Sequence, residues 1–209
     1  MNKENPLSRP TAPRRILLAL TGASAMPFAA ALAKALSTHP EVELHGIISP
    51  GAHRVLQLEG PSEEEIRKCC VQIYPAHDMS APPSSGSWQH GGMIVCPCSM
   101  ATLGAIASGA GTHLVHRAAD VTLKEGRPLI VVPRETPLSS LHLRNMLRLQ
   151  RCGAVIMPPC PGFYHHPTSI EDLTQAFAGR VLEQLGIEHD LYRRWGPASQ
   201  RVAPSRTSC

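Results

Sequence analysis

The sequence predicts a single α/β domain in which a parallel sheet carries helices on both faces, and three observations predict it. The first is length, because a chain of 209 residues is able to bury about two-thirds of its unfolded surface in a packed core. The second is composition: hydrophobic residues make up 43% of the chain and charged residues 17%, which excludes disordered and coiled-coil proteins. The third is an alternation of short apolar runs with longer segments of helical spacing, which is typical of parallel sheets.

The short apolar runs are expected to be strands. They lack strict alternation of apolar and polar residues, as strands covered on both faces do. The expected strands are residues 16–20, 44–48, 93–96, 129–132 and 154–157. The first of them is too short for the core of a signal peptide and ends in a loop of small residues, so we interpret it as part of the fold.

The segments with helical spacing lie between or beyond these strands. The expected helices are residues 26–36, 53–58, 101–107, 115–124, 141–152 and 170–185. Ser169 and Asp172 form a capping-box-like start for the last of them. Gly153 and Gly186 stand where the C-terminal glycine of a helix is expected.

Composition also indicates in which compartment the protein works and which partners it does not bind. Residues 1–13 and 197–209 are rich in proline and polar residues and are expected to be disordered tails, which leaves a domain at residues 14–196. The net charge is only +4 and like charges form no long block, so we expect no nucleic-acid surface. No apolar run approaches the ~18 residues of a membrane span. The seven cysteines lack zinc-site and CxxC spacing and are expected to be unpaired thiols in the reducing cytoplasm.

Two loops that follow expected strands are rich in small and hydroxyl residues. Thr21-Gly22-Ala23-Ser24 follows the first strand, and the segment 97–102 follows the third. Ligands of an open parallel sheet bind beyond the carboxyl ends of its strands, where loops lead into helix N-termini. Helix N-termini favour anions, so the two loops predict an anionic ligand.

Charged and aromatic residues follow the last two expected strands. Arg134 and Glu135 stand side by side in a loop that flanking prolines restrict, which favours a preorganised catalytic site. Arg117 and Lys124 are seven residues apart on one helix face and are placed to converge on an anion. Tyr164 lies in a proline-rich turn, where its phenol suits a ring or a phosphate. Neighbouring histidines in this turn lack a carboxylate partner, so no metal site is predicted.

Together these motifs resemble the UbiX/Pad-type flavin prenyltransferases. The resemblance covers roughly residues 14–196. Its motifs are Gly22-Ala23-Ser24, the segments 96–102, 117–125 and 133–139, Asn145-Met146-Leu147, the segment 162–165 and Arg194-Trp195-Gly196.

The resemblance implies a Rossmann-like (flavodoxin-like) subunit, assembled into a dodecamer, that acts without a metal. It implies that the enzyme binds reduced FMN and joins a dimethylallyl group from dimethylallyl phosphate to N5 and C6 of the flavin. The prenylated FMN then serves a UbiD-type decarboxylase. The choice between a monophosphate and a pyrophosphate donor stays open.

The resemblance also implies roles for individual residues. The FMN-contacting positions are Gly22, Ala23, Ser24, Ser49, Ser99, Met100, Ala101, Thr102 and Arg134. The donor-binding positions are Tyr164, Arg180, Lys124 and Trp195, the last of them supplied by a neighbouring subunit. The catalytic positions are Glu135, Glu59, Lys124 and Arg117.

These residue types suit the chemistry. Cations and a tyrosine hydroxyl stabilise the departing phosphate. Glu135, kept in place by Arg134, is the candidate acid/base for the proton lost on ring closure. A tryptophan, Trp195, offers a π face to the developing allyl cation.

The chain departs from the family pattern at two places. Ala25 and Met26 stand where the family reads Gly-Ala, and their added side chains are expected to crowd the flavin or its phosphate. His113 stands where many relatives carry Asn, which is by resemblance a buried polar position.

The sequence disfavours three other functions. A flavin-dependent cysteine decarboxylase of the same fold group carries a Pro-x-Met-Asn-x-x-Met signature, which is absent here. A non-catalytic flavin-binding regulator is disfavoured by the intact set Lys124, Arg134, Glu135, Tyr164 and Arg180. An NAD-dependent dehydrogenase needs a GxGxxG loop and a later acidic residue, and both are missing.

Overall fold

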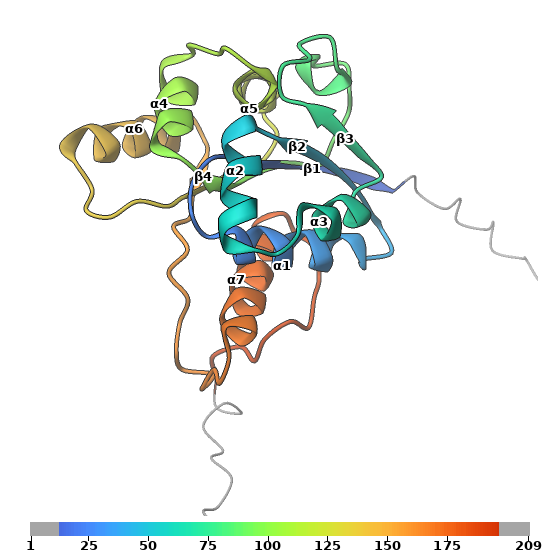
Figure 1. Ribbon diagram of the computed structural model, residues 1–209, viewed down its shortest axis with the longest axis vertical. Coiled ribbons are helices and arrows are strands. Elements are labelled where there is room, and N and C mark those ends of the chain that lie inside the picture. Colours follow the sequence, from blue (N-terminus) through green and yellow to red (C-terminus); the bar gives the residue numbers. More distant parts are fainter. Residues whose placement is uncertain (1–12, 197–209) are drawn as a thin grey trace, which may run out of the picture.

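The chain folds into three layers, with a parallel sheet between two layers of helices (Figure 1). The structure is a computed structural model and describes residues 13–196. The predicted tails, residues 1–13 and 197–209, lie outside the described residues except for Pro13. The strand order is β3-β2-β1-β4-β5-β6 and every pair is parallel. This is the order of the doubly wound Rossmann sheet, whose winding reverses between β1 and β4, so the predicted fold class is confirmed.

The predicted strands are all present. The strands are β1 (Arg14–Leu20), β2 (Val42–Ile48), β3 (Gln72–Pro75), β4 (Met93–Cys98), β5 (Leu129–Pro133) and β6 (Val155–Ile156). Strand β3 was not predicted from the sequence. It is a short edge strand that begins with a polar residue, ends with a proline and has no fully buried residue, so it lacks an apolar run.

The predicted helices are also present, with bounds that differ by a few residues. The helices are α1 (Met26–Ser37), α2 (Pro50–Glu59), α3 (Glu63–Cys69), α4 (Met100–Ser108), α5 (Leu114–Lys124), α6 (Ser140–Arg151), α7 (Ile170–Gln184) and a 3-10 turn, η1 (Pro82–Ser84). Helix α3 was missed because Ile66 is its one buried residue. The helix begins with a capping box of Ser62 and Glu65, a pattern in the sequence that could have predicted this start.

Alternate residues of β1 point to opposite faces and build two cores. Ile16, Leu18 and Leu20 pack with α1, α2, α3 and α7 on one face. Leu17 and Ala19 pack with α4, α5 and α6 on the other. All five side chains are buried, and burying each leucine or isoleucine contributes about 1.5–3 kcal/mol. The central strands are thus held from both sides, which makes the carboxyl edge of the sheet a rigid platform.

The predicted helix ends agree with the structure. Ser169 and Asp172 form a capping box at the start of α7. Gly153 and Gly186 follow α6 and α7 with φ values of 96° and 66°, the left-handed conformation that favours glycine.

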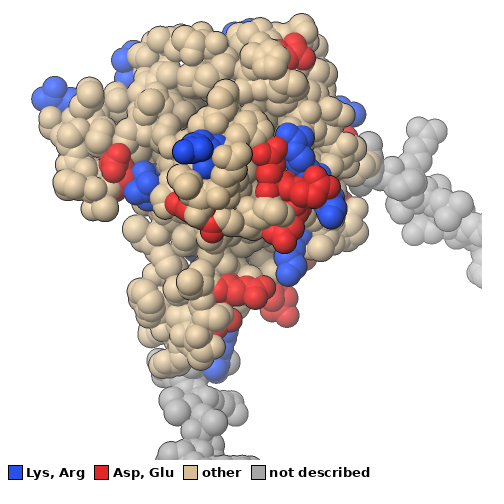
Figure 2. Space-filling model, viewed as in Figure 1, with Lys and Arg blue, Asp and Glu red and all other residues tan. Residues whose placement is uncertain are grey.

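The face shown in Figure 2 carries charges of both signs. Acidic side chains gather over α3, whose first turn holds Glu63, Glu64 and Glu65, and basic side chains lie among them. This face therefore presents no continuous basic surface. Within residues 13–196, no helix is both long and apolar enough to cross a membrane.

Candidate active site

The loops after β1 and β4 meet at the carboxyl edge of the sheet, where the winding reverses. Thr21, which is 1% exposed, joins them. Its Oγ1 donates to the carbonyl oxygen of Pro97 at 2.8 Å and accepts the N–H of Ser99 at 2.8 Å. No role was predicted for Thr21, although a threonine directly after a buried strand is a candidate for a hydrogen bond to a neighbouring loop.

The loops after β1 and β2 approach each other as closely as backbones can. A Cβ on Gly22 would lie 3.1 Å from the Cα of Gly51, and one on Gly51 would lie 3.0 Å from the Cα of Gly22. Any side chain at either position would therefore collide with the facing backbone, so this close approach of the two loops requires glycine. Ser49 closes this loop, because its Oγ accepts the N–H of Ala52 at 3.2 Å and caps α2.

The loops after β4 and β5 complete the platform. The Oγ of Ser99 accepts the N–H of Thr102 at 3.2 Å and so caps α4. Its neighbours Met100 and Ala101 form the first turn of this helix. The N–H of Arg134 donates to the carbonyl oxygen of Cys98 at 3.2 Å. The structure therefore brings the predicted FMN-contacting residues of four separate loops to one edge of the sheet.

This platform fits an anionic, planar ligand such as FMN. The Nε of Arg134 is buried and has no hydrogen-bond partner among the described residues. A buried donor left unpaired costs about 1–3 kcal/mol, so an acceptor on a ligand would stabilise it. The N-termini of α2 and α4 lie at the same edge of the sheet and offer backbone N–H groups to a phosphate.

Glu59 lies against the first loop, as the resemblance implies. Its Oε2 accepts the N–H groups of Ala25 at 3.0 Å and Met26 at 3.1 Å. Ala25 is the N-cap of α1 and provides no side-chain cap, so the carboxylate of Glu59 takes that role. Because one anion already occupies the N-terminus of α1, a flavin phosphate would be held by α2 or α4 instead.

Met26, which was expected to crowd the flavin or its phosphate, lies in the core of the protein. Met26 is fully buried and packs in the core between α1 and the sheet. It is the first residue of α1, and its side chain turns under the helix, away from the loop. Ala25, the other residue that differs from the family pattern, affects the backbone conformation, because its φ of 90° lies in the left-handed region.

The predicted donor-binding residues Tyr164, Arg180 and Trp195 lie together. Tyr164 and Arg180 line a cavity of about 290 Å³ between the end of β6 and α7. The ring of Trp195 meets that of Tyr164 edge to face, with 5.3 Å between centroids. Trp195 is 70% exposed, and the C-terminal segment that carries it returns along α7. Its contribution to the donor site of a neighbouring subunit stays a prediction.

Arg117 and Lys124 share one face of α5, as predicted, but do not converge with the donor cavity of their own chain. The Nε of Arg117 donates to the carbonyl oxygen of Ser84 at 3.1 Å, and its Nη1 pairs with Asp120 at 2.8 Å. Lys124 pairs with Glu125. Lys124 ends α5 shortly before β5 begins, at the amino edge of the sheet, whereas the donor cavity follows the carboxyl end of β6.

Glu135 differs from its predicted setting. It is exposed, and its Oε1 accepts the N–H of Thr136 at 3.0 Å. The expected pairing with Arg134 is not among the contacts of the described residues, since the side chains of adjacent residues diverge here. Glu135 is therefore held by the loop backbone.

His113 occupies a partly buried position, as the resemblance implies. It is the N-cap of α5 without a side-chain cap, and its ring stacks on that of His116 at 3.7 Å. Burial lowers the pKa of His113. The stacked pair stands directly before Arg117 and fixes the start of the helix that carries this cation.

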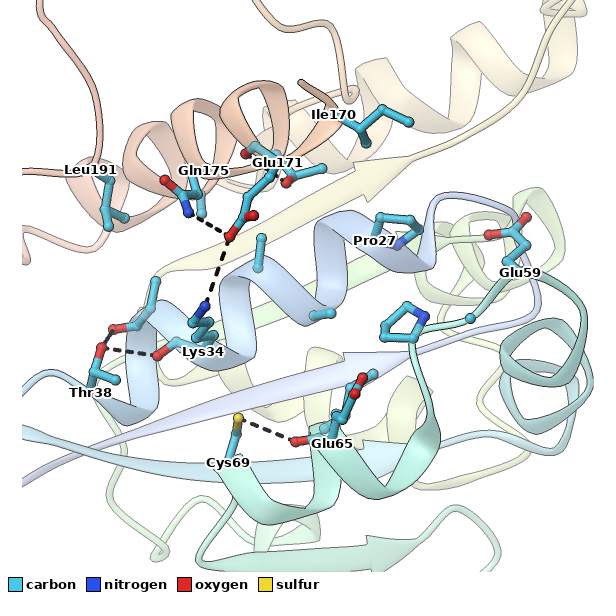
Figure 3. Close-up of a pocket in the computed structure, with 18 residues that line it drawn as sticks. Pro27, Lys34, Thr38, Glu59, Glu65, Cys69, Ile170, Glu171, Gln175 and Leu191 are labelled. Carbon is cyan, nitrogen blue, oxygen red and sulfur yellow. Dashed lines mark hydrogen bonds and ion pairs between the residues drawn. The ribbon is translucent and has the colours of Figure 1, made fainter. Parts of the chain in front are cut away.

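A larger hollow than the donor cavity lies elsewhere. It is a groove of about 830 Å³ between α1, α3 and α7 (Figure 3). Small residues of α1 form its floor, and Lys34 and Glu171 pair across it at 3.8 Å. Of the predicted site residues only Glu59 lines it, so the groove is distinct from the flavin platform and the donor cavity.

Comparisons with known proteins show the family of this chain. The flavoprotein family model matches residues 4–181. The flavin prenyltransferase UbiX of Pseudomonas aeruginosa is 44% identical over 199 residues, which cover 88% of this chain and 95% of the relative.

Two solved structures share the fold closely. A dodecameric FMN-dependent UbiX-like decarboxylase from Escherichia coli O157:H7 is 45% identical, with a TM-score of 0.85 over 87% of this chain and 99% of that one. AnUbiX in complex with FMN and dimethylallyl pyrophosphate is 44% identical, with a TM-score of 0.85 over 88% of this chain and 98% of that one. The chain thus belongs to the flavoprotein family and, within it, to the UbiX-type flavin prenyltransferases.

Proposed function

We propose that this protein transfers a dimethylallyl group from dimethylallyl phosphate to N5 and C6 of reduced FMN, and that the prenylated FMN serves a UbiD-type decarboxylase. The observation that carries the proposal is the presence, in one subunit of this family, of a loop platform with the buried, unpaired Nε of Arg134 and a separate cavity lined by Arg180 and Tyr164. A flavin site alone would suit any flavoprotein. A second cavity with a cation and a phenol adds the means to bind a phosphate ester.

The platform residues would hold FMN. The N-termini of α2 and α4, capped by Ser49 and Ser99, offer N–H groups to the phosphate. The small residues of the loop at Gly22 would lie against the ligand, and the unpaired Nε of Arg134 would meet an acceptor on it. When bound in its reduced form, the flavin supplies the nucleophilic N5 and C6 atoms.

The donor cavity assists the departure of phosphate. The allylic C–O bond of the donor breaks and its electron pair leaves with the phosphate oxygen. Arg180 balances the charge on this oxygen and the hydroxyl of Tyr164 donates to it. The proton displaced from N5 would leave with the phosphate. Closing the ring at C6 would consume the C=C bond of the allyl group, which gains one proton while C6 releases one, and Glu135, on the loop beside Arg134, would carry this proton.

The donor site is completed by a second copy of the chain, which supplies Arg117 and Lys124. The relative from Escherichia coli is dodecameric, and we infer a homo-oligomer, a dodecamer, for this chain as well. Helix α6 supports this, because Leu141, Leu143 and Leu147 are 63%, 53% and 49% exposed and would gain from burial. We also place the protein in the cytoplasm, where its unpaired thiols would stay reduced.

Product mass tests the reaction. Purified protein given reduced FMN and dimethylallyl phosphate, without added metal, should form a flavin heavier by one five-carbon unit in a mass spectrum. A folded, FMN-loaded sample that forms no such product would exclude the proposed activity.

A variant tests the division of roles. Arg180→Ala should weaken the use of dimethylallyl phosphate about 100-fold, because a charge-assisted contact of the donor is worth about 1.5–3 kcal/mol. FMN affinity, measured by flavin fluorescence, should stay at the wild-type value. Arg193→Ala, an exposed cation nearby, is the control. Equal loss of donor use and FMN affinity would contradict the assignment of Arg180.

A further inference from the structure

Glu183 of α7 gathers polar side chains around one carboxylate. The hydroxyl of Tyr192 donates to its Oε1 at 2.8 Å. The Nε2 of His189 and the Nε of Arg194 each lie 3.5 Å from the same oxygen. Arg180 pairs with the other oxygen, Oε2. With its side chain only 22% exposed, Glu183 is the shared anchor of this cluster, and the sequence analysis did not single it out.

The segment 189–195, here called the C-terminal strap, sits in a notch of α7. A Cβ on Gly179 would lie 2.6 Å from Cε1 of His189 and 2.7 Å from Cδ1 of Tyr192. Gly179 is one helical turn before Glu183, so both rings lie directly on the helix backbone beside the anchor. Any other residue at this position would push the strap outward.

The strap forms part of the donor cavity. Tyr192 lines this cavity together with Arg180 and Tyr164. Trp195, at the end of the strap, lies edge to face on Tyr164. The strap is thus held at Gly179 and Glu183 and carries Trp195 onto the ring of Tyr164, which lines the cavity.

The charges of the cluster favour an ionised anchor. Burial raises the pKa of Glu183, but the hydrogen bond from Tyr192 and the charges of Arg180, His189 and Arg194 outweigh this effect and lower it. The Nδ1 of His189 accepts the N–H of Leu191 at 3.2 Å. Its Nε2 faces Glu183 and has no hydrogen-bond partner among the described residues.

We propose that Glu183 is a positioning residue for the prenyl donor: it holds Arg180 at the cavity wall and seats the strap so that Trp195 covers Tyr164. The inference rests on the proposed function, in which Arg180 and Tyr164 bind the donor phosphate. Without the carboxylate, Arg180 loses its ion pair and turns toward solvent, and the strap loses its central anchor. The flavin platform is made by other loops and is unaffected.

Kinetics test the positioning role. Glu183→Gln should raise the KM for dimethylallyl phosphate about 10-fold, change kcat less than about twofold, and leave FMN affinity unchanged. Glu183→Asp keeps the charge and should recover part of the loss. Glu188→Gln removes an exposed carboxylate close to the strap and should match the wild type.

Limited proteolysis tests the strap without activity. Trypsin cuts after arginine, and Arg193 and Arg194 lie on the strap. Cleavage after these residues, followed by mass spectrometry, should be about 10-fold faster in Glu183→Gln and Gly179→Ala than in the wild type and in Glu188→Gln. Tyr192→Phe, which keeps the ring but loses the hydrogen bond, should lie between them.

The outcomes separate the two proposals. A wild-type enzyme that forms no prenylated flavin would refute the proposed function. An active wild-type enzyme, with KM and strap cleavage unchanged in Glu183→Gln, would refute only the role of Glu183. If Glu183→Gln fails to fold, Gly179→Ala and Tyr192→Phe decide: wild-type cleavage and KM in both would overturn the inference. Equal loss of donor use and FMN affinity in these variants would overturn it too.

Discussion

Ala25 holds a backbone conformation that residues with a side chain rarely adopt. Its φ and ψ are 90° and 32°, in the left-handed region, where a Cβ costs about 1–2 kcal/mol. The family pattern places glycine here, and Glu59 binds the N–H of Ala25 at 3.0 Å. Contact with Glu59, 34 residues away, helps to hold the strained loop at the flavin platform.

Replacing Ala25 by glycine should stabilise the fold. Ala25→Gly removes the left-handed penalty but adds freedom to the unfolded chain, so the free energy of unfolding should rise by about 0.5–1 kcal/mol. Urea unfolding of the flavin-free protein measures this change. Ala23→Gly, in the same loop but without a positive φ, should be destabilising. A destabilised Ala25→Gly would show that the left-handed conformation carries no cost.

At the scale of elements, the site depends on how β1 and β4 are joined. Thr21 links the ends of these strands through two hydrogen bonds of 2.8 Å. Both of its partners are main-chain groups, the carbonyl of Pro97 and the N–H of Ser99, at the entrance to α4. The position of the α4 N-terminus therefore follows from one buried hydroxyl.

Removing this hydroxyl should loosen the platform. Thr21→Val keeps the shape but leaves the N–H of Ser99 without its partner, whereas the carbonyl of Pro97 keeps the main-chain N–H of residue 21 at 3.2 Å. The free energy of unfolding should therefore fall by about 1–3 kcal/mol. FMN affinity should fall with it, because α4 carries a predicted phosphate contact. Urea unfolding and fluorescence titration measure the two effects. Thr21→Ser restores the hydroxyl and should recover both, and a valine variant equal to the wild type would contradict the link.

Much of this arrangement was predictable from the sequence, because buried parallel strands and the loops at their carboxyl ends leave local patterns. Apolar runs predicted five of the six strands, β1, β2, β4, β5 and β6. The carboxyl ends of parallel strands share one edge of the sheet, so Ser24, Ser99 and Arg134 were expected to lie near one another. The elements that escaped, β3 and α3, bury few residues and have weak patterns.

Contacts between distant segments escaped for a different reason. The cap that Glu59 provides to α1, and the seat of the strap on Gly179, are made by side chains with no shared local pattern. The turning of Met26 into the core depends on where α1 begins, which sequence patterns locate only to within a few residues. The resemblance supplied Glu59 as a site residue, but only the structure shows what it binds.

At the scale of the whole molecule, buried histidines tie stability to pH. Burial lowers the pKa of His90 and of His116 to about 4, with the charge of Arg127 adding to the effect at His90 and that of His113 at His116. The unfolded chain binds protons at both histidines near pH 6.5, and the folded chain does so only near pH 4. Between these values the unfolded state holds more protons, so stability increases with pH.

Acidification should therefore destabilise the protein well before its carboxylates titrate. Between pH 6.5 and pH 4 the free energy of unfolding should fall by about 1 kcal/mol per pH unit for each of the two histidines. His116→Gln should reduce this slope, and His77→Asn, an exposed position, should leave it unchanged. Urea unfolding at a series of pH values measures the slope. A flat profile between pH 6.5 and pH 5 would contradict the prediction.

The two edges of the sheet limit how copies of this chain can meet. Strand β3 has four residues and ends in Pro75, which has no N–H, and β6 has two residues. A foreign strand joins a sheet by pairing with a long free edge, and neither edge offers enough main-chain donors and acceptors for that. A subunit boundary in any assembly of this protein is therefore formed by helix and loop side chains, and the sheet ends within each subunit.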